Sequence, residues 1–244
     1  MAIGDLDQQG QLDLAMVGAQ GLAIVTTAYH WQLAVHGIYP AGVEPAAVAI
    51  ADLDGDGDED VVVANHGSKK GEGGGLTVHL NAGAGVFAPA VQYAAGLRPL
   101  DVATGDLDAD GDVDVVVADE GAKGRGVSVL LNAGNGTFAP AVHYEQSAPP
   151  LSVVVGDVDR DGDLDLATTN YPSGSSYDGA LAVLVNDGHG AFGSAMSYQL
   201  PGRPQDVVIG DLDGDGDGDM AVARDDYYVS KGGDVAVLLR DCVQ

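Results

Sequence analysis

The 244-residue sequence predicts an all-β fold, a β-propeller of about five four-stranded blades whose last blade is incomplete. Two observations lead to this prediction. An acidic segment recurs along the chain, beginning at residues 5, 52, 106, 157 and 211, so the repeating unit is about fifty residues long. Each segment is followed by short β-branched apolar runs between glycine-rich turns, a pattern that is typical of successive short strands.

The second repeat shows the expected elements of one unit. An apolar first strand leads into the acidic segment, and a second strand follows it directly. A glycine-rich loop precedes the third strand, and a tight turn precedes the fourth. In order, these elements are the first strand at 47–51, the acidic segment at 52–60, the second strand at 61–64, the third at 76–80, the turn at 81–85 and the fourth strand at 87–93. Four short strands joined in this way predict one blade of a propeller.

We expect a single propeller domain over residues 1–244, with repeats at about 1–42, 43–96, 97–148, 149–202 and 203–244. The fifth repeat stops after its third strand at 235–239, so the last blade lacks its outermost strand. An exposed apolar edge invites pairing with another chain, which predicts self-association through the edge of the last blade. Two closures are open, a five-bladed ring and an arc of a larger propeller, and we expect the ring.

A phenylalanine and a tyrosine lie six residues apart near the fourth strand of three repeats. Because side chains alternate between the faces of a strand, an even spacing predicts that both rings share one face. We expect these rings to pack between neighbouring blades. The pairs are Phe87 and Tyr93, Phe138 and Tyr144, and Phe192 and Tyr198.

Four acidic segments follow the pattern D-x-D-x-D-G-D-x-D, and the first is degraded to D-L-D-Q-Q-G-Q-L-D. Side chains at positions one, three and five converge on one point, the glycine at six permits a sharp turn, and the position-seven carbonyl and position-nine carboxylate complete an oxygen shell. Such a shell suits Ca²⁺, which takes about six to eight oxygen ligands. The segments differ from EF-hands, which have Glu at position twelve and flanking helices. A solvated acidic turn explains one copy but not four, because unneutralised carboxylates repel each other.

The candidate metal ligands occupy the odd-numbered positions of the five segments. We expect four strong Ca²⁺ sites and a weaker first site, where a glutamine replaces the aspartate at position five. The candidates are Asp5, Asp7, Gln9, Gln11 and Asp13; Asp52, Asp54, Asp56, Asp58 and Asp60; Asp106, Asp108, Asp110, Asp112 and Asp114; Asp157, Asp159, Asp161, Asp163 and Asp165; and Asp211, Asp213, Asp215, Asp217 and Asp219.

Composition limits the classes of function. The net charge is −27, so we expect no nucleic-acid partner. The chain has no apolar stretch of about eighteen residues, so we expect no membrane insertion, and we expect no signal peptide among the few residues before Asp5. Histidines and serines lack the spacing of a zinc enzyme or a hydrolase elbow. We therefore expect no catalytic activity.

The unit P-x-x-V-x-x-G-D-L-D-G-D-G-D-x-D-x-x-V-A, followed by V-L-L-N-x-G-x-G-x-F, resembles the FG-GAP/VCBS repeats over nearly the whole chain. Such repeats occur in the head of integrin α-subunits and in many secreted bacterial and fungal proteins. The resemblance implies a calcium-binding propeller, extracellular or on the cell surface, that serves adhesion by binding a protein or a glycan. The integrin relatives have about seven blades, a number within the usual range for propellers, which makes the arc of a seven-bladed propeller the alternative to a ring.

The connections between second and third strands leave each blade on the side opposite the acidic segments. Loops on a rigid scaffold often carry binding residues, although exposed lysine and glycine can serve solubility alone. We interpret the chain as a non-enzymatic binding module. Two alternatives stay open, a carbohydrate-binding lectin with sites between blades and a catalytic or non-catalytic domain of a secreted polysaccharide-degrading enzyme. The candidate ligand-binding residues are Tyr171, Tyr177, Tyr227, Tyr228, Lys69 and Lys70.

Overall fold

The computed structural model describes residues 1–28, 32–68, 72–121, 125–171, 178–225 and 233–239. The secondary structure of the described residues is β throughout, and none of them forms a helix long and apolar enough to cross a membrane. In chain order the strands are β1 (Ala2–Gly4), β2 (Asp13–Gly18), β3 (Gly21–Ala28), β4 (Gln32–Tyr39), β5 (Pro45–Ala51), β6 (Asp60–Asn65), β7 (Gly75–His79), β8 (Val91–Tyr93), β9 (Pro99–Gly105), β10 (Asp114–Asp119), β11 (Gly126–Leu130), β12 (Val142–Glu145), β13 (Pro150–Gly156), β14 (Asp165–Asn170), β15 (Gly179–Leu184), β16 (Met196–Leu200), β17 (Arg203–Gly210), β18 (Asp219–Asp225) and β19 (Asp234–Leu238).

These strands form five antiparallel sheets, each in up-and-down order. Four sheets have four strands (β1 to β4, β5 to β8, β9 to β12 and β13 to β16), and the last has the three strands β17, β18 and β19. The predicted all-β blades are confirmed, including the incomplete last one. That the five sheets form a single domain stays a prediction.

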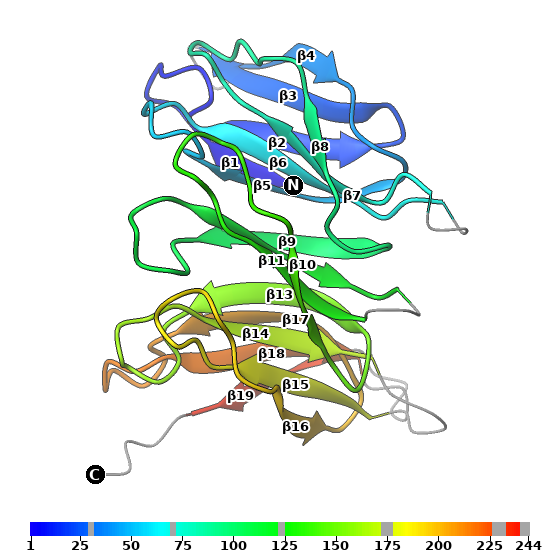
Figure 1. Cartoon of the computed structure of the whole chain (residues 1–244), viewed down its shortest axis with the longest axis vertical. Helices are drawn as coiled ribbons and strands as arrows, with labels where there is room; N and C mark the ends of the chain where they lie inside the picture. Colours follow the sequence, from blue (N-terminus) through cyan, green and yellow to red (C-terminus); the bar gives the residue numbers. More distant parts are fainter. Residues whose placement is uncertain (29–31, 69–71, 122–124, 172–177, 226–232, 240–244) are drawn as a thin grey trace.

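The five sheets are stacked in chain order along the long axis of the molecule, with the first and last sheets at opposite ends (Figure 1). Among the described residues, the substantial interfaces between sheets join consecutive ones, such as β5 with β9, β9 with β13 and β13 with β17. The sheets therefore form an open arc. The closed five-bladed ring that we expected is wrong.

Neighbouring sheets bury both faces of the middle ones, which explains why the second strands read as continuous apolar runs. All residues of β6 are buried. Val61 and Val63 pack toward the first sheet, whereas Val62 packs toward the third. β-branched side chains fit such a pleated, packed surface well. The core is thus a series of apolar layers between consecutive sheets, and these layers hold the acidic connections in fixed places.

An edge-to-face pair of rings bridges each of the first three joints between sheets. The phenylalanine comes from the later sheet and the tyrosine from the earlier one. The pairs are Phe87 with Tyr39, Phe138 with Tyr93, and Phe192 with Tyr144, with ring centroids 5.0, 5.2 and 5.4 Å apart. The prediction that the phenylalanine and tyrosine rings pack between blades is confirmed for Phe87, Tyr93, Phe138, Tyr144 and Phe192. Tyr198 is in none of these pairs and is 46% exposed.

The prediction that the two rings of one repeat share a face is wrong. Phe87 contacts the first sheet through Tyr39, whereas Tyr93 contacts the third sheet through Phe138. The alternation rule fails because the segment is not one continuous strand. Phe87 makes only an isolated bridge with Asn81, and β8 begins after it, so the even spacing does not fix a common face.

Candidate metal centre

A cluster of carboxylates lies in the connection between the first and second strands of every sheet. These connections emerge on one side of the arc, at the left in Figure 1. In each cluster the carboxylates at positions one, three and nine of the acidic segment bring oxygens within 4.8 Å of one another. The clusters are Asp5, Asp7 and Asp13; Asp52, Asp54 and Asp60; Asp106, Asp108 and Asp114; Asp157, Asp159 and Asp165; and Asp211, Asp213 and Asp219.

The carboxylate at position nine fixes the segment to the rest of its sheet. Asp60 is fully buried. Its Oδ2 accepts the N–H of Leu53 at 2.8 Å, and its Oδ1 accepts the N–H of Asn81 at 2.6 Å. Asp60 therefore ties the acidic segment to the turn between the third and fourth strands. Asp114 and Asp165 make the same two bonds in their own sheets.

The carboxylate at position one shapes the turn of the segment. Asp52 accepts the N–H of Gly55 at 2.8 Å on Oδ1 and the N–H of Gly57 at 3.0 Å on Oδ2. Gly57, at position six, has a φ of 89°, in the left-handed region that glycine adopts without strain. This glycine lets the backbone fold back over Asp52, as the sequence predicts.

Burial and mutual repulsion raise the pKa of several of these carboxyl groups. Burial raises the pKa of Asp60 and Asp114 to about 6, although backbone N–H donors act in the opposite direction. Burial also raises the pKa of Asp54, and the neighbouring negative charges of Asp56 and Asp52 raise it further. A nearby cation would favour the ionised form of all these groups.

The third cluster has donor atoms that fit a cation. Asp106 Oδ1 and Asp108 Oδ1 are buried and have no hydrogen-bond partner. A buried polar oxygen without a partner is costly, and a hard divalent cation bound by oxygen ligands satisfies it. The acidic clusters can therefore hold metal ions, and their all-oxygen donor set matches the preference of Ca²⁺.

The side chains at positions five and seven lie outside these clusters. Asp56 Oδ1, at position five, accepts the N–H of Asp58 at 2.9 Å. The position-seven carboxylate of Asp112 faces the turn after the third strand, where a β-carbon on Gly134 would lie 2.3 Å from its Oδ2. For the residues at positions five and seven, metal binding stays a prediction. These residues are Gln9, Gln11, Asp56, Asp58, Asp110, Asp112, Asp161, Asp163, Asp215 and Asp217.

The degraded first segment keeps the common geometry. The backbone N–H of Gln9 donates to Asp5 Oδ1 and to Asp7 Oδ1, both at 3.1 Å. The three-carboxylate cluster is therefore present, with neutral amides at positions five and seven. That this site is weaker than the other four stays a prediction.

The opposite side of the arc carries a second set of polar residues, which we call the loop face. It consists of Glu44, His66, Arg98, Glu120 and Tyr171. Three of these directly follow the second strand of a sheet, and each donates its backbone N–H to a carbonyl just before the first strand of the same sheet. These bonds join His66 to Glu44, Glu120 to Arg98, and Tyr171 to Pro149, at 2.9, 3.3 and 2.8 Å.

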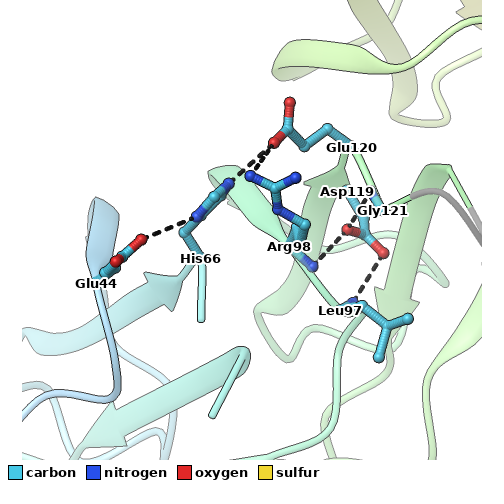
Figure 2. A network of polar contacts seen from close by, with 7 residues as sticks. All are labelled: Glu44, His66, Leu97, Arg98, Asp119, Glu120 and Gly121. Atoms are coloured by element: carbon cyan, nitrogen blue, oxygen red, sulfur yellow. Dashed lines mark hydrogen bonds and ion pairs between the residues drawn. The ribbon is translucent and has the colours of Figure 1, made fainter. Parts of the chain in front are cut away.

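A network on the loop face links the second and third sheets (Figure 2). His66 lies between two carboxylates, with Nδ1 3.4 Å from Glu44 Oε2 and Nε2 2.9 Å from Glu120 Oε1. Arg98 Nη2 lies 2.9 Å from the same Glu120 oxygen. Sequence reasoning missed Glu44, His66 and Glu120. The available signal was the alignment of the residue directly after each second strand, which places His66, Glu120 and Tyr171 in one series.

Among the predicted ligand-binding residues, the structure describes Tyr171, which is 38% exposed. Two basic residues on this side bind carboxylates of the protein itself. Arg98 pairs with Glu120, and Arg224 Nη2 donates to Asp234 Oδ2 at 2.8 Å. These cations therefore do not present unpaired charge to an anionic ligand. The predicted residues that lie outside the described part of the chain are Lys69, Lys70, Tyr177, Tyr227 and Tyr228.

We compared the chain with curated proteins and with solved structures. No curated protein matches the chain. One similar solved structure is the crystal structure of the V. cholerae biofilm matrix protein Bap1, with 20% identity and a TM-score of 0.49. The match covers 96% of this chain and 36% of that one, so the chain spans about a third of that chain's length.

The comparison with family models is more specific. The model described as FG-GAP-like repeat matches three overlapping segments, residues 5–63, 52–117 and 106–168. Each match begins at position one of an acidic segment, and together the matches span more than half of the chain. The repeated sheets and carboxylate clusters agree with this assignment, and the chain belongs to the FG-GAP-like repeat family.

Proposed function

We propose that the chain is an extracellular, calcium-loaded module that binds another protein or a glycan and catalyses no reaction. The observation that carries the proposal is the recurrence of one three-carboxylate cluster in all five described sheets. Membership of the FG-GAP-like repeat family supports an adhesion-type role outside the cell.

The exposure of the fifth cluster suits a calcium-rich medium. Asp211 and Asp213 are exposed, and only Asp219 of that cluster is buried. Ligands that remain open to water bind less tightly than preorganised ones, and extracellular calcium modules have dissociation constants of about 10⁻⁴ to 10⁻³ M. On this proposal, calcium is a structural ion that secures the scaffold and takes no part in chemistry.

We assign ligand binding to the loop face. Its described residues present the carboxylates of Glu44 and Glu120, the imidazole of His66 and the ring of Tyr171. Because Arg98 is already paired with Glu120, this surface suits hydrogen bonding to hydroxyl or amide groups, or pairing with a cation, better than capture of a phosphate or sulfate.

A binding screen tests the proposal. The full chain is immobilised and probed with arrays of glycans and matrix proteins, once in Ca²⁺ and once in EDTA. We expect a ligand whose capture needs calcium and is weakened by Tyr171→Ser and by Glu120→Gln. His189→Ser, an exposed change on the metal side, is the matched control and should leave capture unchanged. If neither loop-face variant weakened capture of the ligand, the binding site would not be on the loop face.

The lectin alternative has one observation in its favour. A groove of about 510 Å³ lies between the first and second sheets and is lined by Tyr39, Thr77 and Gln92, among others. An aromatic ring beside hydroxyl and amide groups suits a sugar. Glycan binding that survives the loop-face changes but is lost in Gln92→Ala would favour this groove.

A further inference from the structure

His79 is a buried histidine at a position where the next two sheets have leucine. It pairs with Val61 between β6 and β7, and the equivalent residues of the third and fourth sheets are Leu130 and Leu184. All three side chains are buried. A leucine fills an apolar layer without a polar atom to satisfy, so packing alone does not account for an imidazole here. Such a departure from the pattern of the other repeats points to a role in function.

The imidazole of His79 is held in one orientation. Burial lowers its pKa, and the ring donates a hydrogen bond to the backbone carbonyl of Pro40. The rings of Tyr39 and Phe87 meet it edge-to-face, with centroids 6.0 and 6.3 Å away. Because Nε2 is buried and has no hydrogen-bond partner among the described residues, the donor to Pro40 is Nδ1. In this neutral tautomer Nε2 is an acceptor, and a buried acceptor without a donor is costly.

His79 lines the groove of about 510 Å³ between the first and second sheets. Two neighbouring hydroxyl groups in this groove are already engaged. Thr77 Oγ1 accepts the side-chain N–H of Asn65 at 2.9 Å, and the Tyr39 hydroxyl donates to the carbonyl of Gly85 at 3.3 Å. None of the described residues that line the groove is an acid, a lysine or an arginine. The groove therefore suits an uncharged, mostly apolar group with one hydrogen-bond donor.

We propose that this groove binds a tyrosine or tryptophan side chain of a partner protein, whose single O–H or N–H donates to His79 Nε2. Both side chains are large apolar rings with one polar group, and a dry cavity of about 150 Å³ is sufficient to bind benzene. A sugar fits this site less well, because it presents several hydroxyl groups and one buried acceptor satisfies only one of them.

The groove adjoins the loop face. A second hollow, of about 420 Å³, is lined by Glu44 of the loop face and shares Pro40 and Ala41 with the groove. A partner protein that contacts the loop face can therefore place one aromatic side chain in the groove. Such an anchor rests on the protein-binding function proposed above and makes it more specific.

Capped amino acids are suitable probes, because they are uncharged and differ by single groups. Titrated into the full chain in Ca²⁺ and followed by protein NMR, N-acetyl-tyrosinamide and N-acetyl-tryptophanamide should shift the amide signals of Thr77 and Phe87. They should also shift the nitrogen signal of His79 Nε2. N-acetyl-phenylalaninamide lacks only the hydroxyl of the tyrosine probe. It should bind about two- to tenfold more weakly, the effect of one hydrogen bond, and leave the Nε2 signal in place.

His79→Leu supplies the residue that the next two sheets have at this position. The variant should fold without loss of melting temperature and should bind the tyrosine and phenylalanine probes equally. His143→Leu is the matched control, because it removes an exposed imidazole that bonds to Ser128 in the third sheet. It should leave the preference for the tyrosine probe unchanged.

Three results would overturn the proposal. The first is equal binding of the tyrosine and phenylalanine probes to the unmodified chain, or binding of neither. The second is a preference for the tyrosine probe that survives in His79→Leu, which would place the acceptor elsewhere. The third is tighter binding of methyl glycosides than of the tyrosine probe at the same residues, which would identify a sugar site. Because these small probes need only the groove, their binding and the loop-face variants of the binding screen give independent answers.

Discussion

The side-chain amide of Asn132 donates a hydrogen bond of 2.7 Å to the carbonyl oxygen of Leu53, which lies 79 residues earlier in the chain. Leu53 is the second residue of the acidic segment in the preceding sheet. The backbone N–H of the same Asn132 donates to Asp114, the position-nine carboxylate of its own sheet. One residue thus connects two consecutive candidate metal centres. Asn81 and Asn186 make the equivalent inter-sheet bonds, at 2.8 and 2.7 Å.

Removing this amide should destabilise the joint between sheets. Asn132→Ala removes the bonds of this amide to the carbonyls of Leu53 and Val113. Leu53 keeps the backbone N–H of Gly136 as a donor, at 2.8 Å, so each lost bond should cost about 0.5–1.5 kcal/mol. Denaturant unfolding in Ca²⁺ measures the change. Asn135→Ala, an exposed change in the same turn whose side chain bonds only within it, should have a much smaller effect. Equal effects of the two variants would mean that the inter-sheet bond contributes little.

Calcium should stabilise the arc as a whole. A site filled at one hundred times its dissociation constant adds about 2.7 kcal/mol, and several such sites amount to much of an ordinary folding stability of about 5–15 kcal/mol. The melting temperature should fall steeply in EDTA, recover with Ca²⁺ and recover poorly with Mg²⁺, which demands a smaller octahedral shell. A melting temperature that does not change in EDTA would rule out a structural role for the metal.

The structure separates the role of position nine from that of position seven. Asp114 belongs to the cluster and holds two backbone N–H groups, whereas the Asp112 side chain faces Gly134. Asp114→Asn should therefore abolish calcium binding at the third site and lower stability. Asp112→Asn should retain the site, because removing its negative charge leaves the cluster intact. Calorimetric titration of the two variants measures the number of sites, and loss of the same site in both would contradict this division.

The pH dependence of stability should reverse sign when calcium is added. Folding raises the pKa of Asp60 and Asp114 from 3.8 to about 6, so the folded protein holds more protons than the unfolded one between about pH 4 and 6. Without metal, the stability from these groups is full below the unfolded pKa and is lost as the pH rises through the folded pKa.

In EDTA the melting temperature should thus be higher near pH 5 than near pH 7. With Ca²⁺ it should be lower near pH 5, because protons then compete with the metal for the same oxygens. Thermal unfolding at both pH values, with and without Ca²⁺, measures the two slopes. Slopes of the same sign would show that the position-nine carboxylates do not control this behaviour.

The repeats and the acidic segments could be predicted because their information is local. A glycine at position six and aspartates at positions one, three and nine define the same turn wherever they occur, so the clusters follow from spacing alone. The side of the sheet on which Phe87 and Tyr93 each lie could not be predicted. It depends on where β8 begins and on which neighbouring sheet each ring contacts. The prediction of a closed ring was wrong for a related reason. The angle between consecutive sheets arises from the packing between them, which no single repeat encodes.

The loop-face network shows the same limit. His66 and Glu120 lie 54 residues apart in sequence, and nothing at either position alone marks a partner. They meet because equivalent positions of consecutive sheets are stacked side by side (Figure 2). Comparison of equivalent positions between repeats, more than inspection of single motifs, is what relates such residues.

The first acidic segment supplies a test of how much charge the clusters need. Its three clustered carboxylates are Asp5, Asp7 and Asp13, but Gln9 stands at position five, where every other segment has an aspartate. Because a neutral amide attracts a cation less than a carboxylate does, calorimetry should show four similar calcium sites and one weaker site. Gln9→Asp should strengthen the weak site.

Gln8→Asp is the matched control for the first segment. It adds the same charge at the neighbouring position four, which is outside the predicted shell, and aspartate tolerates the positive φ of 57° found there better than most residues. A gain in affinity from Gln9→Asp alone would show that position five supplies a ligand. An equal gain from both variants would mean that overall charge near the segment sets the affinity, and five equal sites in the unmodified protein would remove the distinction between the first segment and the others.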